Sequence, residues 1–193
     1  MKNQVFTPPG RVLFSADHHL NHAGVIRMCR RPFASVEEMN GFLIEAWNSV
    51  VRPNDTVFHL GDFAMGASPE QCAGFFGALR GRKHFIVGNH DKARVTSLAW
   101  ESVSERATVD TGGHRLVLDH YPLRAWNGVF RGALHLHGHT HGSLSGTSQS
   151  CDVGVDCWAY RPVALPDILE RLAATPARPE EIERAAAREA GDA

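Results

Sequence analysis

The chain has 193 residues, of which 43% are hydrophobic, and its 20 basic and 21 acidic side chains leave a formal net charge of −1. A chain of this length is expected to form one domain around a single core. The balanced charge argues against the strongly positive surface of a dedicated nucleic-acid binder, although a local basic patch is compatible with it. No segment approaches the ~20 apolar residues that cross a bilayer, and residues 1–10 lack a signal-peptide core, so we expect a soluble, cytoplasmic protein without a membrane partner.

The first half of the chain alternates strand and helix signals. Short apolar runs at 11–16, 56–60 and 84–87 are typical of strands, and each is followed directly by polar residues of metal-binding type. Residues 35–51 begin with Ser35 and Glu38, which have the spacing of a capping box, and they carry one apolar stripe. This pattern predicts an amphipathic helix. Residues 69–80, closed by a glycine, predict a second helix. This order favours an α/β sheet flanked by helices.

The second half has the character of antiparallel structure. The runs 107–111 and 115–119 flank a Gly-Gly turn and predict a hairpin. Further strands are expected at 133–137 and 151–156, and a short helix at 166–173. We therefore expect one domain over residues 1–175, followed by a charged C-terminal tail, 176–193, that is helical or partly disordered.

Five short polar motifs punctuate these elements: Asp17-His18-His19, Gly61-Asp62, Gly88-Asn89-His90-Asp91, His120, and Gly138-His139-Thr140-His141. Imidazole, carboxylate and carboxamide groups are suitable ligands for divalent transition metals. On an extended chain, residues two apart point the same way, so both histidines of the last motif can face one site. The motifs together predict a centre in which two cations share one carboxylate.

The five motifs, read in this order over residues 17–141, resemble the calcineurin-like metallophosphoesterase superfamily, whose pattern is DxH, GD, GNH followed by an acid, a lone His, and GHxH. The resemblance implies a four-layer α/β/β/α sandwich of two mixed sheets flanked by helices. It also implies two divalent metal ions, with manganese expected and iron, zinc or mixed pairs compatible with the ligands. In that scheme Asp62 bridges the ions; the first ion binds Asp17, His19 and His141, and the second binds Asn89, His120 and His139.

The same resemblance implies a reaction. A hydroxide bridging the two ions would attack the phosphorus of a phosphomonoester or phosphodiester in line, without a covalent phosphoenzyme. His90 would then protonate the leaving group, and Asp91 would orient the His90 imidazole. Asn89, His22 and Arg31 are candidates for substrate contact. Arg31 belongs to a cluster with Arg27 and Arg30, and such a cluster more often lies on a solvated helix face.

Two interpretations are open for some side chains near the motifs. Asp152 and Asp156 either accept hydrogen bonds from ligand histidines or are polar residues at a strand edge or turn with no role in the site. His18, His59 and His137 are expected to point away from the metals.

Departures from the wider family narrow the subgroup. Asp62 is followed by Phe-Ala-Met-Gly rather than the Asp-Arg-Gly of the protein serine/threonine phosphatases, and Asp91 stands where that branch carries Glu. The chain is more similar to the small, cap-less bacterial and phage phosphoesterases.

Three functions remain open at this point. The first is hydrolysis of small phosphoesters, including cyclic nucleotides, and the second is a nuclease acting on DNA or RNA by the same chemistry. The third is a non-catalytic metal-binding interaction module, whose mark would be missing ligands, and none is missing here. The sequence specifies a reaction class but neither a natural substrate nor an oligomeric state.

Overall fold

The computed structural model describes residues 4–191, and in this range the strands form two five-stranded sheets. Sheet I has the order β10-β2-β3-β4-β5, in which β2 to β5 are parallel and β10 is antiparallel to β2. Its strands, in chain order, are β2 Val12–Ser15, β3 Thr56–His59, β4 Arg82–Ile86, β5 Ser102–Ser104 and β10 Val163–Ala164. The three strand runs predicted in the first half of the chain are the centre of this sheet.

Sheet II has the order β1-β6-β7-β8-β9 and contains the predicted hairpin. In it β6 and β7 are antiparallel, and the remaining neighbours are parallel. The hairpin turn is Gly112-Gly113, where φ is +56° and +79°, a conformation that glycine adopts without strain. The strands are β1 Gln4–Phe6, β6 Arg106–Thr111, β7 His114–Asp119, β8 Leu134–His137 and β9 Ser150–Asp152.

The main core lies between the two sheets. Phe14 and Phe58 of sheet I and Leu116 and Leu118 of sheet II are fully buried there. The residues that alternate with them in sheet I, such as Leu13, face the opposite side and pack under helices. Because β2 and β3 are covered on both faces, all their residues are buried and their apolar residues are consecutive rather than alternating.

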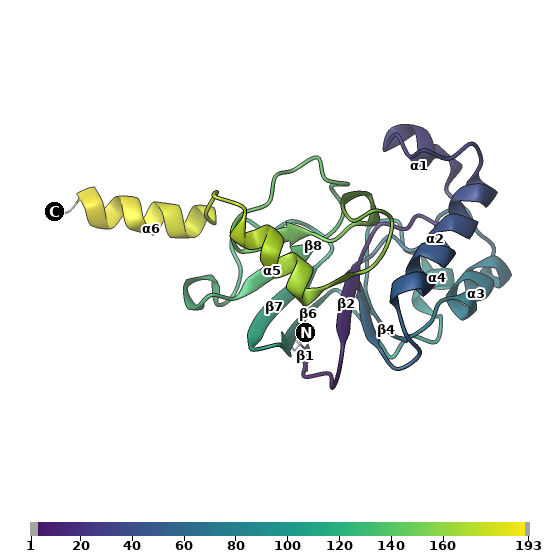
Figure 1. The fold of residues 1–193 in the computed structure, drawn as a ribbon, viewed down its shortest axis with the longest axis horizontal. Helices are drawn as coiled ribbons and strands as arrows, with labels where there is room; N and C mark the ends of the chain where they lie inside the picture. The colour runs from purple at the N-terminus through teal and green to yellow at the C-terminus, as the bar shows by residue number, and fades with distance from the viewer. Residues whose placement is uncertain (1–3, 192–193) are drawn as a thin grey trace.

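Helices cover the outer face of sheet I (Figure 1). They are α1 Ala23–Met28, α2 Val36–Val50, α3 Pro69–Ala78 and α4 Ala93–Thr96. The long predicted helix is confirmed as α2: its N-cap Ser35 accepts a hydrogen bond from the Glu38 amide, while the Glu38 carboxylate accepts one from the Ala34 amide. The complete capping box is instead at α3, where Ser68 and Gln71 satisfy each other's amides.

Thinner cover lies over sheet II. Val117, Trp126 and Val129 form a small cluster on its outer face, together with the 3-10 helix η1 (Val129–Arg131) and Ile182 of α6 (Glu180–Gly191). Helix α5 (Leu165–Ala173) inserts its apolar side chains into the core between the sheets. Two mixed sheets flanked by helices confirm the expected fold class. The C-terminal helix α6 extends away from this body (Figure 1).

The predicted strand 151–156 is wrong in its second half. Strand β9 ends at Asp152, and Val155–Cys157 forms the 3-10 helix η2. The Asp152 carboxylate accepts hydrogen bonds from the amides of Gly154, at 2.7 Å, and Gly142, at 3.0 Å, so the chain turns there instead of extending. Within residues 4–191, no helix is both long and apolar enough to cross a membrane.

Replacing Leu43 by alanine should destabilise the fold strongly. Leu43 lies on α2 with no exposed surface, packed among the residues that join the helices to sheet I, so the change leaves a cavity. We expect a loss of about 3 kcal/mol in the free energy of unfolding, measured by urea denaturation. Glu45→Ala, on the exposed side of the same helix, is the control and should change stability by less than about 0.5 kcal/mol. Equal effects of the two changes would contradict this packing.

Candidate metal centre

The predicted ligands all lie in loops that follow strands. Asp17, Asp62 and Asn89 come after β2, β3 and β4 of sheet I, and His120 and His139 come after β7 and β8 of sheet II. Because parallel strands end at the same edge of their sheet, these loops meet at one end of the sandwich.

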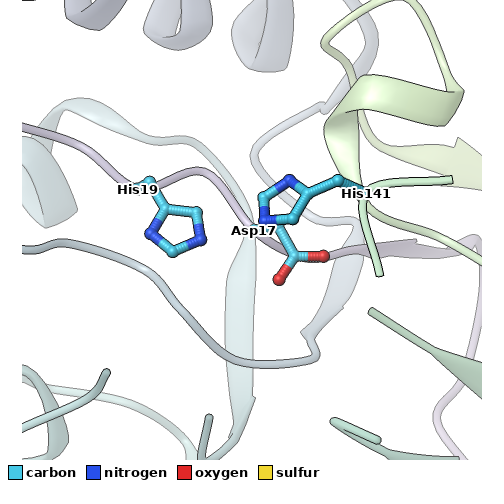
Figure 2. A group of neighbouring side chains, drawn as sticks. All are labelled: Asp17, His19 and His141. Carbon is cyan, nitrogen blue, oxygen red and sulfur yellow. The ribbon is translucent and has the colours of Figure 1, made fainter. Parts of the chain in front are cut away.

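The first group of ligands is Asp17, His19 and His141. Their ligand atoms all lie within 4.8 Å of one another, and Figure 2 shows the three side chains around a common space although they come from distant segments. Both ring nitrogens of His19 are buried and have no hydrogen-bond partner. A buried imidazole with two unsatisfied nitrogens is costly unless an ion or another group completes it, which fits a metal ligand.

The second group is Asp62, His120 and His139, whose ligand atoms also lie within 4.8 Å of one another. Asn89 joins them: its Oδ1 is 2.9 Å from His120 Nε2 and 3.0 Å from His139 Nδ1. The structure therefore brings together all four side chains expected around the second ion.

Asp62 connects the two groups. Its Oδ2 lies 3.5 Å from His19 Nε2 in the first group and 3.5 Å from His120 Nε2 in the second. Its other oxygen, Oδ1, accepts a hydrogen bond from the His90 amide at 2.9 Å, which fixes the carboxylate. One oxygen atom thus stands between two sets of ligands, as a bridging carboxylate requires.

Hydrogen bonds at the back of two histidines set which ring nitrogen is free. His120 Nδ1 donates to the Leu60 carbonyl at 2.8 Å, and His141 Nδ1 donates to Asp156 Oδ2 at 2.7 Å. A carbonyl and a carboxylate can only accept, so the proton is on Nδ1 and the Nε2 lone pair faces the site. Asp156 therefore accepts a hydrogen bond from His141, a predicted ligand, as the first of the two interpretations expected. Asp152 does not contact a predicted ligand histidine in this way: it accepts hydrogen bonds from the Thr140 hydroxyl, at 2.6 Å, and from two backbone amides.

The electrostatics of this ligand set favour a cation. Burial raises the pKa of Asp17, and the nearby carboxylates of Asp152 and Asp62 raise it further. Burial also lowers the pKa of His19 to about 2, with His141 and Arg31 adding to the effect, so this imidazole is neutral and one ring nitrogen has a lone pair available for a metal. Clustered carboxylates with neutral imidazoles form a site that a divalent cation stabilises.

The backbone at the site is strained. Left-handed φ angles between +49° and +69° occur at five of the predicted ligands: Asp17, His19, Asp62, His139 and His141. Such conformations cost about 1–3 kcal/mol each in non-glycine residues and are concentrated at functional sites. The surrounding hydrogen bonds, among them those from the Leu20 amide to Phe63 and from the His139 amide to Asp17, hold this geometry in place.

His90 and His22 lie beside the first group. The His90 ring centre is 5.5 Å from that of His19, and the His22 ring is 5.4 Å from His19 and 6.4 Å from His90. Both side chains are only partly buried, so a molecule at the metal ligands can reach them from solvent. Their placement suits the roles predicted for them.

The Asp91 carboxylate lies against the backbone of two site loops. It accepts hydrogen bonds from the backbone amides of Asp62, Phe63 and Gly88, at 2.8–3.1 Å, and its orientation of the His90 ring stays a prediction. Burial raises the pKa of Asp91, and these backbone hydrogen bonds oppose that rise. Asp91 thus fixes the loops that carry Asp62 and Asn89.

The contacts of Arg31 within the protein do not favour the substrate contact predicted for it. Its guanidinium is buried, and all five N–H groups are used within the protein: by both oxygens of Asp156, by the carbonyls of Asp17 and His18, and by the Met39 sulfur. A phosphate could bind this group only by displacing those partners.

The histidines expected to point away from the site do so. His18 Nδ1 and His59 Nε2 form a buried pair at 2.9 Å, with the His18 ring against Trp47. His137 Nδ1 lies 3.0 Å from the Gly138 carbonyl. Burial lowers the pKa of His18 to about 3, so it belongs to the core as a neutral ring.

Two neighbours of the site were not identified from the sequence. Tyr121 is partly exposed, and its ring centre lies 4.6 Å from that of His139; its position directly after His120 was the available signal. Cys29 approaches His141 and Asp156, with ligand atoms within 4.8 Å of one another. Burial raises the pKa of the Cys29 thiol, so near pH 7 it is a protonated thiol rather than an anionic ligand.

Comparison with known proteins agrees with this geometry. Residues 11–155 match the calcineurin-like phosphoesterase superfamily domain, and the chain belongs to this superfamily of metal-dependent phosphoesterases. It is 33% identical over 170 residues to an uncharacterized protein of Methanocaldococcus jannaschii, a match covering 84% of this chain and 90% of the relative. It is 30% identical over 179 residues to the Gene 66 protein of Mycobacterium phage L5, covering 75% and 86%.

A solved structure shows the same fold. The crystal structure of a protein of unknown function from Aquifex aeolicus superposes with a TM-score of 0.66 at 21% identity, covering 82% of this chain and 97% of that one.

Replacing Gly88 by alanine should disrupt the ligand set. A Cβ atom there would lie 2.4 Å from Asp62 Oδ1 and 2.6 Å from the Asp62 amide, so the Asp62 carboxylate must move. We expect affinity for Mn²⁺ to fall at least tenfold, measured by titrating chelator-stripped protein. Gly74→Ala, on α3 with open space around it, is the control and should bind as the wild type does. Unchanged affinity in Gly88→Ala would contradict the role given to Asp62.

Proposed function

We propose that the protein is a dinuclear metal-dependent phosphoesterase that hydrolyses phosphomonoesters or phosphodiesters. The observation that carries the proposal is the position of Asp62 Oδ2, 3.5 Å from one imidazole nitrogen of each ligand group. Because both groups are complete, a non-catalytic module that has lost its ligands is disfavoured.

Different residues of the chain would bind each of the two ions. Asp17, His19 and His141 would bind one, Asn89, His120 and His139 the other, and Asp62 both. Divalent cations held there supply positive charge for the phosphate oxygens and acidify a water molecule that can then attack phosphorus. The ligand set contains only nitrogen and oxygen atoms, from imidazole, carboxylate and carboxamide groups, which suits manganese, and also iron or zinc.

His90 is the proposed proton donor to the leaving group. Its amide is fixed on Asp62 Oδ1, which places the side chain next to the bridging carboxylate, and its ring stands partly exposed beside His19. His22, adjacent to both rings, is proposed to contact the substrate.

The exposed side of the site indicates where substrate arrives. Asn89 and His139 are exposed, whereas Asp17, Asp62 and His120 are buried, so the second ligand group faces solvent on its Asn89 and His139 side. We propose a small phosphoester, such as a cyclic nucleotide, as the substrate. A nuclease remains the alternative, and release of nucleotides from polymeric DNA or RNA would distinguish the two.

Asp62→Asn should abolish hydrolysis. The amide keeps the shape of the side chain and its acceptor for the His90 amide, but it cannot bridge two cations as a carboxylate does. We expect kcat/KM for an aryl phosphodiester with Mn²⁺ to fall by at least about 10³-fold. Asp110→Asn, on the exposed β6–β7 hairpin, should keep wild-type activity. An active Asp62→Asn enzyme, or wild-type activity that survives complete chelation, would refute the proposal.

His90→Gln should affect substrates according to their leaving group. A 4-nitrophenolate leaves without protonation, whereas an alkoxide needs a proton, so a lost donor matters only for the second. We expect kcat to fall about 10²-fold for an alkyl ester and less than tenfold for the nitrophenyl ester. His114→Gln, remote from the site, is the control. Equal losses on the two substrates would rule out His90 as the donor.

A further inference from the structure

Arg31 is a buried arginine whose bonds connect parts of the site that are far apart in the sequence. Its Nη2 donates to the Asp17 carbonyl at 2.7 Å and its Nη1 to the His18 carbonyl at 2.9 Å, so it holds the loop that carries two ligands of the first group. The same guanidinium forms a two-pronged ion pair with Asp156, through Nε–Oδ1 and Nη2–Oδ2, each at 2.8 Å.

Asp156 continues the connection to the third ligand of that group. Its Oδ2 accepts the Nδ1 proton of His141 at 2.7 Å, from a residue 15 positions away in the sequence. Burial acts to raise the pKa of Asp156, but the hydrogen bonds from His141 and Arg31 outweigh it and hold that pKa below the usual value. Asp156 therefore remains a carboxylate with both oxygens engaged.

We infer that Arg31 and Asp156 are positioning residues that assemble the first metal subsite, an inference that rests on the proposed function. Asp156 fixes the proton of His141 on Nδ1 and thereby turns the Nε2 lone pair towards Asp17 and His19. Arg31 fixes Asp156 and, through two carbonyls, the backbone that presents those same two residues. Arg31 and Asp156 do not orient the second ligand group, where His120 Nδ1 donates a hydrogen bond to the Leu60 carbonyl instead.

A purely structural role explains this arrangement less well. A buried ion pair contributes little net stability, because desolvation offsets its attraction. Asp17 and His19 have left-handed backbone that the loop does not favour by itself, and the two carbonyl hydrogen bonds of Arg31 fall directly on this segment. The bonds of Arg31 therefore lie where the subsite needs external support.

Asp156→Asn tests the inference without leaving a cavity. Asparagine keeps one acceptor but loses the charge and one acceptor oxygen, so it cannot serve both His141 and the fork of Arg31. The measurement is histidine ¹⁵N NMR of chelator-stripped protein, before and during titration with Zn²⁺. Asp110→Asn is the matched control, because Asp110 and Arg115 form the same two-pronged pair, at 2.8 and 2.9 Å, on the exposed hairpin.

In the wild type and the control, we expect metal-free His141 to carry its proton on Nδ1. In Asp156→Asn, we expect a mixture of tautomers and a 10–100-fold weaker Zn²⁺ affinity reported by His19 and His141, with the affinity reported by His120 and His139 unchanged. Wild-type tautomer and affinity in the variant, or equal weakening in both groups, would overturn the inference. Wild-type protein that bound no Zn²⁺ at either group would instead overturn the proposed function.

Arg31→Lys is the second variant, and it decides the matter if Asp156→Asn does not fold. Lysine keeps a positive charge beside Asp156 but cannot also span the two carbonyls. We expect the Nδ1 tautomer of His141 to persist while the affinity of the first group falls about tenfold. Unchanged affinity at that group would count against the role of Arg31.

Discussion

The site depends on one carboxylate held between two groups of ligands. Asp62 follows a buried parallel strand of sheet I, has a left-handed φ of +57°, and is fixed through Oδ1 by the His90 amide, so that Oδ2 faces His19 and His120 together. The Asp91 carboxylate fixes the same loop by accepting hydrogen bonds from the backbone amides of Asp62 and Phe63. Every other ligand can be described by the side of Asp62 on which it lies.

The packing of the fold offsets the unfavourable free energy of this arrangement. Several neighbouring carboxylates and neutral histidines are buried at the ends of the strands, on a backbone that non-glycine residues disfavour. Close packing between the sheets and under α2 supplies the stability against which this strain is held. The glycines at 61, 88 and 138 leave room there, since a Cβ at each would lie within 2.4–2.6 Å of a ligand residue or its neighbour.

The sequence predicted which side chains meet at the candidate site because each motif is tied to a local signal. An apolar run buried on both faces predicts a parallel strand, and the polar residue after it must lie at the common edge, which placed Asp17, Asp62 and Asn89 together. Short elements such as β1, β5 and α1 were missed, since three to six residues carry too little periodicity and form only against neighbours. The backbone partners of Asp91 and the pairing of Arg31 with Asp156 were not predicted for a related reason: the two members of each contact come together only after the chain has folded, and no local pattern reveals it.

The most direct test of the account is anomalous diffraction from crystals grown with excess Mn²⁺. We predict two anomalous peaks on opposite sides of Asp62 Oδ2, ~3.5–4 Å apart, one within ligand distance of His19 and the other of His120. A single peak under every metal concentration, or two peaks that do not share Asp62, would contradict the claim that this carboxylate joins two metal ions.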